Sequence, residues 1–455
     1  MIRAARVFLA FAALAIAGDK VYAQPAPDLD PQIVRLVGQV STDRLVAILK
    51  KLESFGTRNT MSPTDSPTRG IGAARQWIFD EFKTYSPRLQ VSYDTYVIAT
   101  QGRITRDTEA RNVMAVLPGR SPRRIYVSGH YDTVAIEGGQ GGANATAPGT
   151  VRRNDPDSTA PGVNDDGSGV ALTMELARIF SQSGIEFDAT LVFMCHVAEE
   201  QGLMGAKLHA QKAKAQHVVI DAVLNNDIVG GAVGGNGIID GASIRVYSEG
   251  PEDSPSRELA RYVQRWGMRY VPSHKVRLMA RPDRFSRGGD HTGYTMYGFP
   301  AVGFRESREN FTRQHDARDT FEGISPMYLA QNARVNAAAA ATLALAPERP
   351  VVVNDRGQAT INRAPSGYDA HVMWKASQGA AAYRIFWREA WGPDWQHDML
   401  VGNVTEVTLP NTLIDDLVFG VAAVDTAGHE SIVSPYIAPP STAVDGGDIK
   451  TVPAR

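Results

Sequence analysis

Apolar residues recur at helical spacing in several segments of the first three quarters of the chain. Within 73–85, the apolar positions fall three or four residues apart and form one stripe, made by Ala74, Trp77, Ile78 and Phe82. The same spacing predicts helices at 43–52 and 168–183, and an alanine-rich run predicts a long helix at 326–345.

Short apolar runs of strand length alternate with these helices. Residues 89–97 alternate between apolar and polar and predict a half-buried strand, whereas 190–197 is almost continuously apolar, as is typical of the centre of a parallel sheet. Four further runs predict strands at 112–117, 125–128, 218–225 and 301–304. The alternation predicts an α/β domain with a mostly parallel central sheet flanked by helices.

The pattern changes near Pro347, since the next 90 or so residues have no helical period. Their strand-length runs, separated by turn residues, predict a C-terminal all-β sandwich and lie at 370–374, 382–387, 406–409 and 418–425. The segments HVMWKAS, AYRIFWRE and LVFGVAAVDTAGHES resemble a fibronectin type III domain, in which Trp374 and Tyr383 would be core residues. The usual tyrosine of that family's F strand is replaced by Phe419.

The N-terminal residues predict the localisation of the protein. Residues 1–6 carry two arginines and no acid, 7–18 are a short apolar run, and Val-Tyr-Ala at 21–23 is a plausible cleavage site. This order predicts a signal peptide at 1–23 and export to the periplasm or the extracellular space, with an uncleaved anchor as the alternative. We therefore expect an α/β domain at 24–348, a fibronectin type III-like domain at 349–440 and a flexible tail at 441–455.

Composition narrows the classes of partner and of stabilising group. The net charge is −2 and no basic block appears, which argues against nucleic acid as a partner. No stretch after the first residues approaches the 18 apolar residues that predict a membrane span. Cys195 is the single cysteine, so an internal disulfide is excluded, and an exported chain must rely on core size or bound metal.

Acids and histidines follow the predicted strands and suggest a metal site. His130 comes just after an apolar strand and precedes Asp132 by two residues, so in an extended chain both side chains share a face and the carboxylate can hold the second imidazole nitrogen. Asp165 lies in a Gly-Val-Asn-Asp-Asp-Gly-Ser-Gly turn that opens a helix, where Asp166 or Ser168 would be the N-cap. Asp165 could then bridge two cations through its two oxygens.

Two consecutive acids, Glu199 and Glu200, end a buried strand. Their charges repel each other, and a metal beside one of them would remove the conflict; a solvated acidic turn is the alternative. Asp227 follows the strand at 218–225, and His315 follows the run at 301–304. Carboxylate and imidazole ligands without thiolate suit zinc, with manganese or cobalt as possible substitutes.

Six motifs in this order resemble the co-catalytic di-zinc aminopeptidases of metallopeptidase family twenty-eight, which includes bacterial leucine aminopeptidases and glutamate carboxypeptidase. They are GHYDT, PGVNDDGSG, AEEQGLMGA, NNDIVG, GGDHTGY with GFPA, and QHDARDT, and the match covers 55–345. The resemblance implies a zinc exopeptidase fold with two Zn²⁺ ions. It also implies a role for each motif residue: His130 and Asp227 on one zinc, Glu200 and His315 on the other, Asp165 as the bridge, Glu199 as catalytic general base, and Asp132 as the residue that orients His130.

Some parts of the pattern are less complete. Asp290 and His291 match a family position near the site, and Asp319 would support His315. A tyrosine that some members place just before the Asp-His pair is absent from 284–290, which leaves Arg284, Arg287 or His291 as candidates for the oxyanion contact. The connection 135–161 is long and is expected to rim the substrate cleft.

The predicted function is an exported di-zinc exopeptidase, above all an aminopeptidase acting on peptide or protein N-termini through a zinc-activated water. A carboxypeptidase would need a cation for the terminal carboxylate, and Arg281, Arg284 and Arg287 could supply it, although they could also form a solvated loop. Two further alternatives to the aminopeptidase prediction are a glutaminyl cyclase-like acyltransferase and a non-catalytic binding protein. The C-terminal domain would contact a surface or a polysaccharide.

Overall fold

A computed structural model describes residues 29–136, 155–359, 361–363 and 366–436. The predicted signal peptide at 1–23, the tail at 441–455 and residues 137–154 of the long connection lie outside these ranges. Eight α-helices in the described residues are α1 Pro31–Gly38, α2 Thr42–Glu53, α3 Gly70–Tyr85, α4 Gly167–Gln182, α5 Met204–Ala215, α6 Pro255–Tyr270, α7 Asp290–Thr295 and α8 Pro326–Leu345. The predicted helices therefore correspond to α2, α3, α4 and α8.

A central sheet of eight strands has the order β1-β2-β4-β3-β5-β8-β6-β7. The strands are β1 Gln90–Ile98, β2 Thr108–Leu117, β3 Arg124–His130, β4 Thr190–His196, β5 Ile220–Asn226, β6 Ser243–Ser248, β7 Lys275–Met279 and β8 Ala301–Glu306. The four middle strands, β4, β3, β5 and β8, are parallel to one another. β2 joins this group antiparallel on one side and β6 joins it antiparallel on the other, so the sheet is mixed, with the predicted parallel part at its centre.

Alternate side chains of the middle strands enter two different cores. In β3, Ile125 and Val127 pack into the larger core with α1 to α4, α6 and α8, whereas Tyr126 packs into a smaller core with α5 and α7. The same alternation holds in β4, where every side chain is buried. Helices therefore cover both faces of the sheet, and the polar side chains of these strands lie mostly at or near the strand ends.

Two antiparallel sheets make up the C-terminal part, with strand orders β10-β11-β14 (with β9 on β11) and β13-β12-β15-β16. The strands are β9 Val351–Val352, β10 Asn362–Arg363, β11 Ala370–Lys375, β12 Ala382–Glu389, β13 His397–Val401, β14 Glu406–Leu409, β15 Leu417–Val424 and β16 Ser434–Pro435. Trp374 and Tyr383 are buried with ring centroids 5.3 Å apart, and Phe419 is buried beside them. The predicted two-sheet core is confirmed, and the assignment to fibronectin type III stays a prediction.

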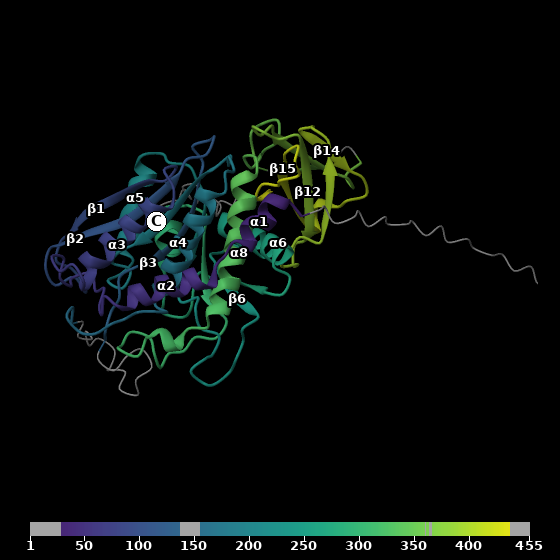
Figure 1. Cartoon of the computed structure of the whole chain (residues 1–455). Coiled ribbons are helices and arrows are strands. Elements are labelled where there is room, and N and C mark those ends of the chain that lie inside the picture. The colour runs from purple at the N-terminus through teal and green to yellow at the C-terminus, as the bar shows by residue number, and fades with distance from the viewer. Residues whose placement is uncertain (1–28, 137–154, 360, 364–365, 437–455) are drawn as a thin grey trace, which may run out of the picture.

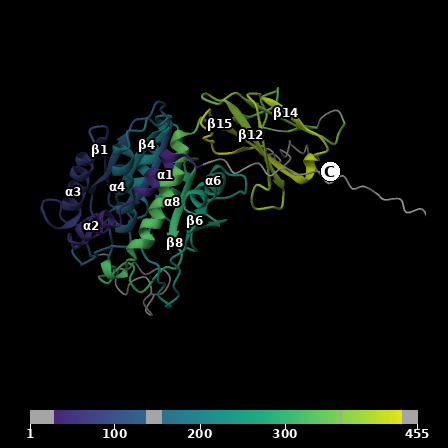
Figure 2. The same cartoon turned by 45° about the vertical axis from the view of Figure 1, so that its right-hand side comes forward.

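Helices α6 and α8 lie between the central sheet and the C-terminal strands (Figures 1 and 2). Tyr262 of α6 donates a hydrogen bond to the main-chain oxygen of Glu430 at 2.8 Å, and Arg261 donates to that of Pro393 at 2.9 Å. Among the described residues, the structure contains no helix with the length and apolar character needed to cross a bilayer.

Candidate metal centre

The carboxyl ends of the parallel strands gather the predicted ligands at one edge of the sheet. His130 is the last residue of β3, Asp227 follows β5 directly, and Glu200 lies in the loop after β4. Asp165 is in the turn before α4, and His315 comes from the loop after β8. Parallel strands bring residues far apart in sequence to this edge because all their carboxyl ends point the same way.

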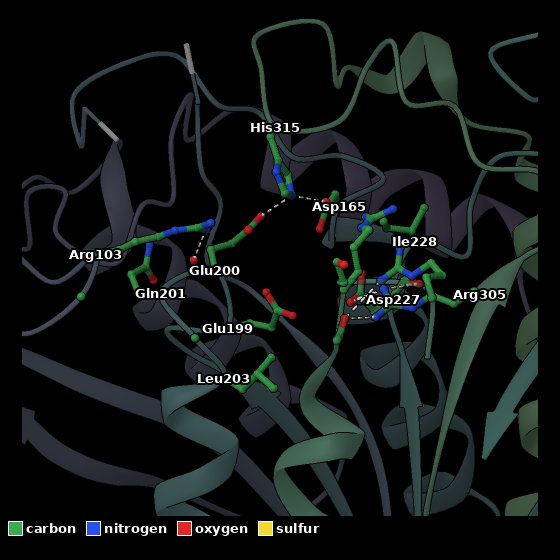
Figure 3. Close-up of a pocket in the computed structure, with 16 residues that line it drawn as sticks. Arg103, Asp165, Glu199, Glu200, Gln201, Leu203, Asp227, Ile228, Arg305 and His315 are labelled. Atoms are coloured by element: carbon green, nitrogen blue, oxygen red, sulfur yellow. Dashed lines mark hydrogen bonds and ion pairs between the residues drawn. The ribbon is translucent and has the colours of Figure 1, made fainter. Parts of the chain in front are cut away.

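The side chains of Asp165, Glu200, Asp227 and His315 line one cavity (Figure 3). Asp165 lies between the two histidines, with Oδ1 3.3 Å from Nε2 of His130 and Oδ2 3.0 Å from Nε2 of His315. Oδ1 of Asp227 is 3.7 Å from the same nitrogen of His130, and Oε1 of Glu200 is 3.3 Å from that of His315. The ligand atoms thus form two groups that share Asp165, namely His130-Asp165-Asp227 and Asp165-Glu200-His315, with atoms within 4.8 Å of one another in each group.

The chemistry of this set fits divalent cations. Nε2 of His130, Oε1 of Glu200 and Oδ1 of Asp227 are buried and have no hydrogen-bond partner among the described residues. Burying several acids together is costly unless cations neutralise them. Carboxylate oxygens and imidazole nitrogens at this spacing would hold zinc in each group.

The acids of the centre differ in how their surroundings affect ionisation. Burial, reinforced by the neighbouring charges of Asp165 and Glu199, raises the pKa of Glu200 well above its ordinary value. For Asp165, burial opposes ionisation, but hydrogen bonds with His130 and His315 lower the pKa well below the usual range. Burial raises the pKa of Glu199 to about 7, although His130 opposes this effect.

Asp132 contacts His130 mainly through its main-chain oxygen, whereas the sequence predicts a contact through its carboxylate. Nδ1 of His130 is 3.0 Å from the main-chain oxygen of Asp132 but 3.6 Å from its carboxylate. The carboxylate instead accepts hydrogen bonds from the main-chain N–H groups of Glu199 and Glu200 at 3.1 and 3.2 Å. Asp132 therefore orients His130 through its carbonyl and holds the Glu199-Glu200 turn through its side chain.

Asp319 also differs from its predicted role. Its carboxylate accepts hydrogen bonds from the main-chain N–H groups of Asn164 and Asp165 at 3.0 and 2.9 Å. Asp319 therefore holds the turn that carries Asp165 in place, and it does not support the imidazole of His315 as predicted. Asp166 is the N-cap of α4, since its Oδ1 accepts a hydrogen bond from the main-chain N–H of Gly169 at 2.8 Å, and this prediction is confirmed.

Asp290 and His291, at the start of α7, are both buried. His291 Nε2 lies 2.8 Å from the main-chain oxygen of Pro282, and the ring is not among the residues that line the cavity. His291 is therefore placed away from the oxyanion position suggested for it. Both carboxylate oxygens of Asp290 have no hydrogen-bond partner in the described part of the chain, and burial and the charge of Glu199 raise its pKa well above the ordinary value.

The cavity above the centre has a volume of about 700 Å³ and contains arginines from three segments. Arg284 and Arg287, the two arginines predicted for the oxyanion contact, line it together with Arg103 and Arg305. Arg305, the fifth residue of β8, donates to the carboxylate of Asp227. Arg305 lies close to the carboxyl end of a parallel strand, where functional residues gather, so the sequence could have identified it as a candidate. Nothing in the sequence around Arg103 identifies that residue as part of the site.

The model of peptidase family M28 matches residues 112–340 of this chain. A probable zinc metalloprotease of Pyricularia oryzae is 37% identical, and the alignment covers 91% of this chain and 85% of that protein. All five candidate ligands lie inside the segment that the family model matches.

Solved structures with similar folds are more distant. The LapA aminopeptidase of Legionella pneumophila has a TM-score of 0.52 and 18% identity, with 71% of this chain and 78% of that chain covered. A glutaminyl cyclase of Porphyromonas gingivalis has the same TM-score of 0.52 at 17% identity, with 66% of this chain and 97% of that chain covered. At these identities the likeness shows the fold, and it does so equally for a peptidase and a cyclase.

Proposed function

Because this chain belongs to peptidase family M28, we propose that it is a zinc peptidase with two metal ions that removes residues from the N-termini of peptides or proteins. The observation that carries the proposal is the pair of ligand groups that share Asp165. The resemblance to a zinc metalloprotease over nine-tenths of the chain supports the hydrolytic activity.

One ion would be held by His130 and Asp227, the other by Glu200 and His315, with an oxygen of Asp165 for each. When bound, a pair of zinc ions supplies an activated water at neutral pH and polarises the substrate carbonyl. Asp165 is suited to be the shared ligand because its two oxygens already face different histidines.

Glu199 is the group that would move the proton. Its carboxylate lines the cavity, and Oε2 lies 3.9 Å from Nε2 of His130. A carboxylate in this position can take a proton from water and return it to the leaving amine. Hydrogen bonds from the main chain of Glu199 and Glu200 to Asp132 fix the direction of both side chains.

The acidic end of the centre favours an aminopeptidase over a carboxypeptidase. A free α-amine is a cation, and Glu199, which is not assigned to a metal ion, offers it negative charge. A blocked N-terminus would lose this interaction. Glutaminyl cyclase-like acyl transfer is the second candidate because of the shared fold, but two complete ligand groups support hydrolysis by a metal pair.

The proposal has two further parts, which are export of the protein and binding of a surface by its C-terminal domain. The basic and then apolar order of the first 18 residues supports export to the periplasm or the extracellular space. None of the cavity residues comes from the C-terminal part, so this part is free to contact a surface or a polysaccharide.

The test is to purify the full mature chain and to measure metal content and hydrolysis together. We expect about two zinc ions per chain and loss of hydrolysis on chelation. Aminoacyl substrates with a free amine should be cleaved and their acetylated forms should not. Full activity with one ion or none, or cleavage that tolerates acetylation but fails after C-terminal amidation, would contradict this proposal.

A further inference from the structure

One side of the cavity is formed by Arg284 and Arg287, from the loop between β7 and α7, and Arg305 of β8, which we call the arginine wall. The sequence alone left the loop arginines open as either a solvated loop or a carboxylate site. The side chains of Arg284 and Arg287 are only 10% and 19% exposed, so a solvated loop is not what the structure shows. Arg281 of the same loop stacks on exposed Phe285 and does not line the cavity.

Too few acids accompany the wall to neutralise it. Glu309 accepts from Arg284 and Arg287 at 2.8 and 2.7 Å, and also from Arg245 at 2.8 Å. Burial opposes ionisation of Glu309, but these guanidinium groups lower its pKa to about 2, so it is fully charged.

Asp283 is the second acid, and it is shared between Arg284 at 2.9 Å and Arg305 at 3.2 Å. Two carboxylates therefore serve four guanidinium groups. Asp227, which also contacts Arg305, is already assigned to a metal ion in the proposed function. The wall consequently presents net positive charge to the cavity.

The wall begins directly at the proposed metal centre. Arg305 donates to the carboxylate of Asp227 and, at 3.1 Å, to its main-chain oxygen. Arg305 and Arg284 both donate to the main-chain oxygen of Gly288, at 2.9 and 3.2 Å, which ties the wall together. Figure 3 shows Arg305 beside Asp227, with Glu199 and Glu200 across the centre from them.

The cationic wall and the carboxylate of Glu199, which is not assigned to a metal ion, would orient a substrate in the cavity. An α-ammonium group would be repelled by the wall and drawn to Glu199, so the leaving side of the cleaved bond would point toward the wall. Guanidinium groups bind carboxylates with strong, charge-assisted hydrogen bonds. From this geometry we infer that the arginine wall binds a carboxylate of the residue on the leaving side, an inference that rests on the proposed aminopeptidase function.

Two sources could supply that carboxylate, the free C-terminus of a dipeptide or an acidic side chain. Four substrates with the same N-terminal residue separate them: Leu-Gly, Leu-Gly-amide, Leu-Glu-amide and Leu-Gln-amide. We expect kcat/KM to be about tenfold higher for at least one acid than for its matched amide, since a hydrogen bond to a charged group contributes about that much. The pair that shows the difference identifies the source.

Arg287→Gln in the full zinc-loaded chain tests the wall itself. It should bring the acid-to-amide ratio close to one, mainly through KM, and Arg287→Lys should restore part of the ratio because it keeps the charge but loses the planar donor pair. Arg281→Gln is the matched control, since it removes an arginine of the same loop that does not line the cavity, and it should keep the wild-type ratio.

Binding of uncleavable analogues distinguishes this inference from the proposed function. Leucyl-glycine with a reduced CH₂–NH bond, as acid and as amide, can be titrated by calorimetry without any turnover. Tighter binding of the acid, lost in Arg287→Gln, would support the wall even if no peptide were hydrolysed. Equal binding and equal kcat/KM for every acid and amide pair would overturn the inference, while chelator-sensitive hydrolysis would keep the proposed function.

Discussion

Glu199 and Glu200 are consecutive glutamates with different surroundings. Oε1 of Glu200 lies 3.3 Å from Nε2 of His315, in one of the two ligand groups. Glu199 belongs to neither group, and its carboxylate faces the cavity. The main chain of both residues is held by Asp132, so one residue controls two side chains that point in different directions.

Replacing Glu199 by Gln should separate proton transfer from metal binding. The amide cannot take a proton, so we expect kcat to fall at least about 100-fold while zinc content and thermal stability are retained. Glu200→Gln is the matched control one residue away and should lower zinc occupancy. Steady-state kinetics with metal analysis of both variants decides the matter, and a nearly fully active Glu199→Gln would require another base.

Replacing Asp132 by Asn should be milder than replacing His130 by Ala. The amide side chain would keep one oxygen acceptor for the turn but lose the second, so the Glu199-Glu200 segment should loosen without loss of a ligand. We expect a decrease of roughly 10- to 100-fold in zinc affinity or activity, measured by competition with a chromogenic chelator. If both variants lost zinc to the same extent, Asp132 would itself be a ligand.

Most of the candidate ligand residues could be predicted because they follow an apolar strand or open a helix, and the edge of a parallel sheet brings such positions together. Their partners could not be predicted in the same way. The two-residue spacing correctly placed Asp132 beside His130, but the carboxylate turned to main-chain N–H groups 67 and 68 residues later in the chain. Arg305 was missed because its partners, Asp227 and Asp283, are adjacent only in the folded chain.

At the scale of elements, α6 buries charged side chains beside an apolar stripe of Leu259, Tyr262, Val263 and Trp266. Arg257, Glu258 and Arg261 of this helix are buried although they are charged. Glu258 accepts a hydrogen bond from Nε1 of Trp395 at 2.9 Å, and burial raises its pKa to about 7. A polar helix face can be buried when its partners lie in another domain, and those partners come more than 130 residues later.

A histidine links the turn after β15 to the start of α1. His429 lies between two carboxylates, with Nδ1 2.8 Å from Asp425 and Nε2 2.7 Å from Asp30, the N-cap of α1. Burial opposes the charged imidazole, but both acids raise the pKa of His429 above its ordinary value. Because the folded pKa is raised, the stabilisation is complete below the unfolded pKa of about 6.5 and is lost as the pH rises through the folded value.

His429→Gln should therefore destabilise the protein at pH 6 more than at pH 9. We expect a difference in unfolding free energy on the order of 0.5–1 kcal/mol between the two pH values, since both partner carboxylates are partly exposed. Urea unfolding of wild type and variant at both pH values measures it. His397→Gln changes an exposed histidine of the same domain and should show no such difference; an equal loss at pH 6 and pH 9 would mean that His429 does not act through its charge.

At the scale of the whole molecule, the cavity and the C-terminal strands are separate. Every residue that lines the cavity precedes residue 316. The C-terminal strands instead contact α6 and the loop before it, for example through Arg388, which donates to Asp253 of that loop at 2.6 Å. The second domain is thus placed to affect the stability of the first without contributing to the proposed chemistry.

A chain ending at Pro347 should show this division directly. We expect kcat/KM on small aminoacyl substrates within about threefold of the full chain, because no cavity residue is removed. The melting temperature should fall, since Glu258 and Arg261 lose Trp395 and the carbonyl of Pro393 as partners, and buried charged groups depend on such partners. Circular dichroism and zinc content must first show that the shortened chain is folded and loaded. A folded, zinc-loaded chain without activity would show that the C-terminal domain shapes the cavity through α6, and the two domains would then have to be treated as one catalytic unit.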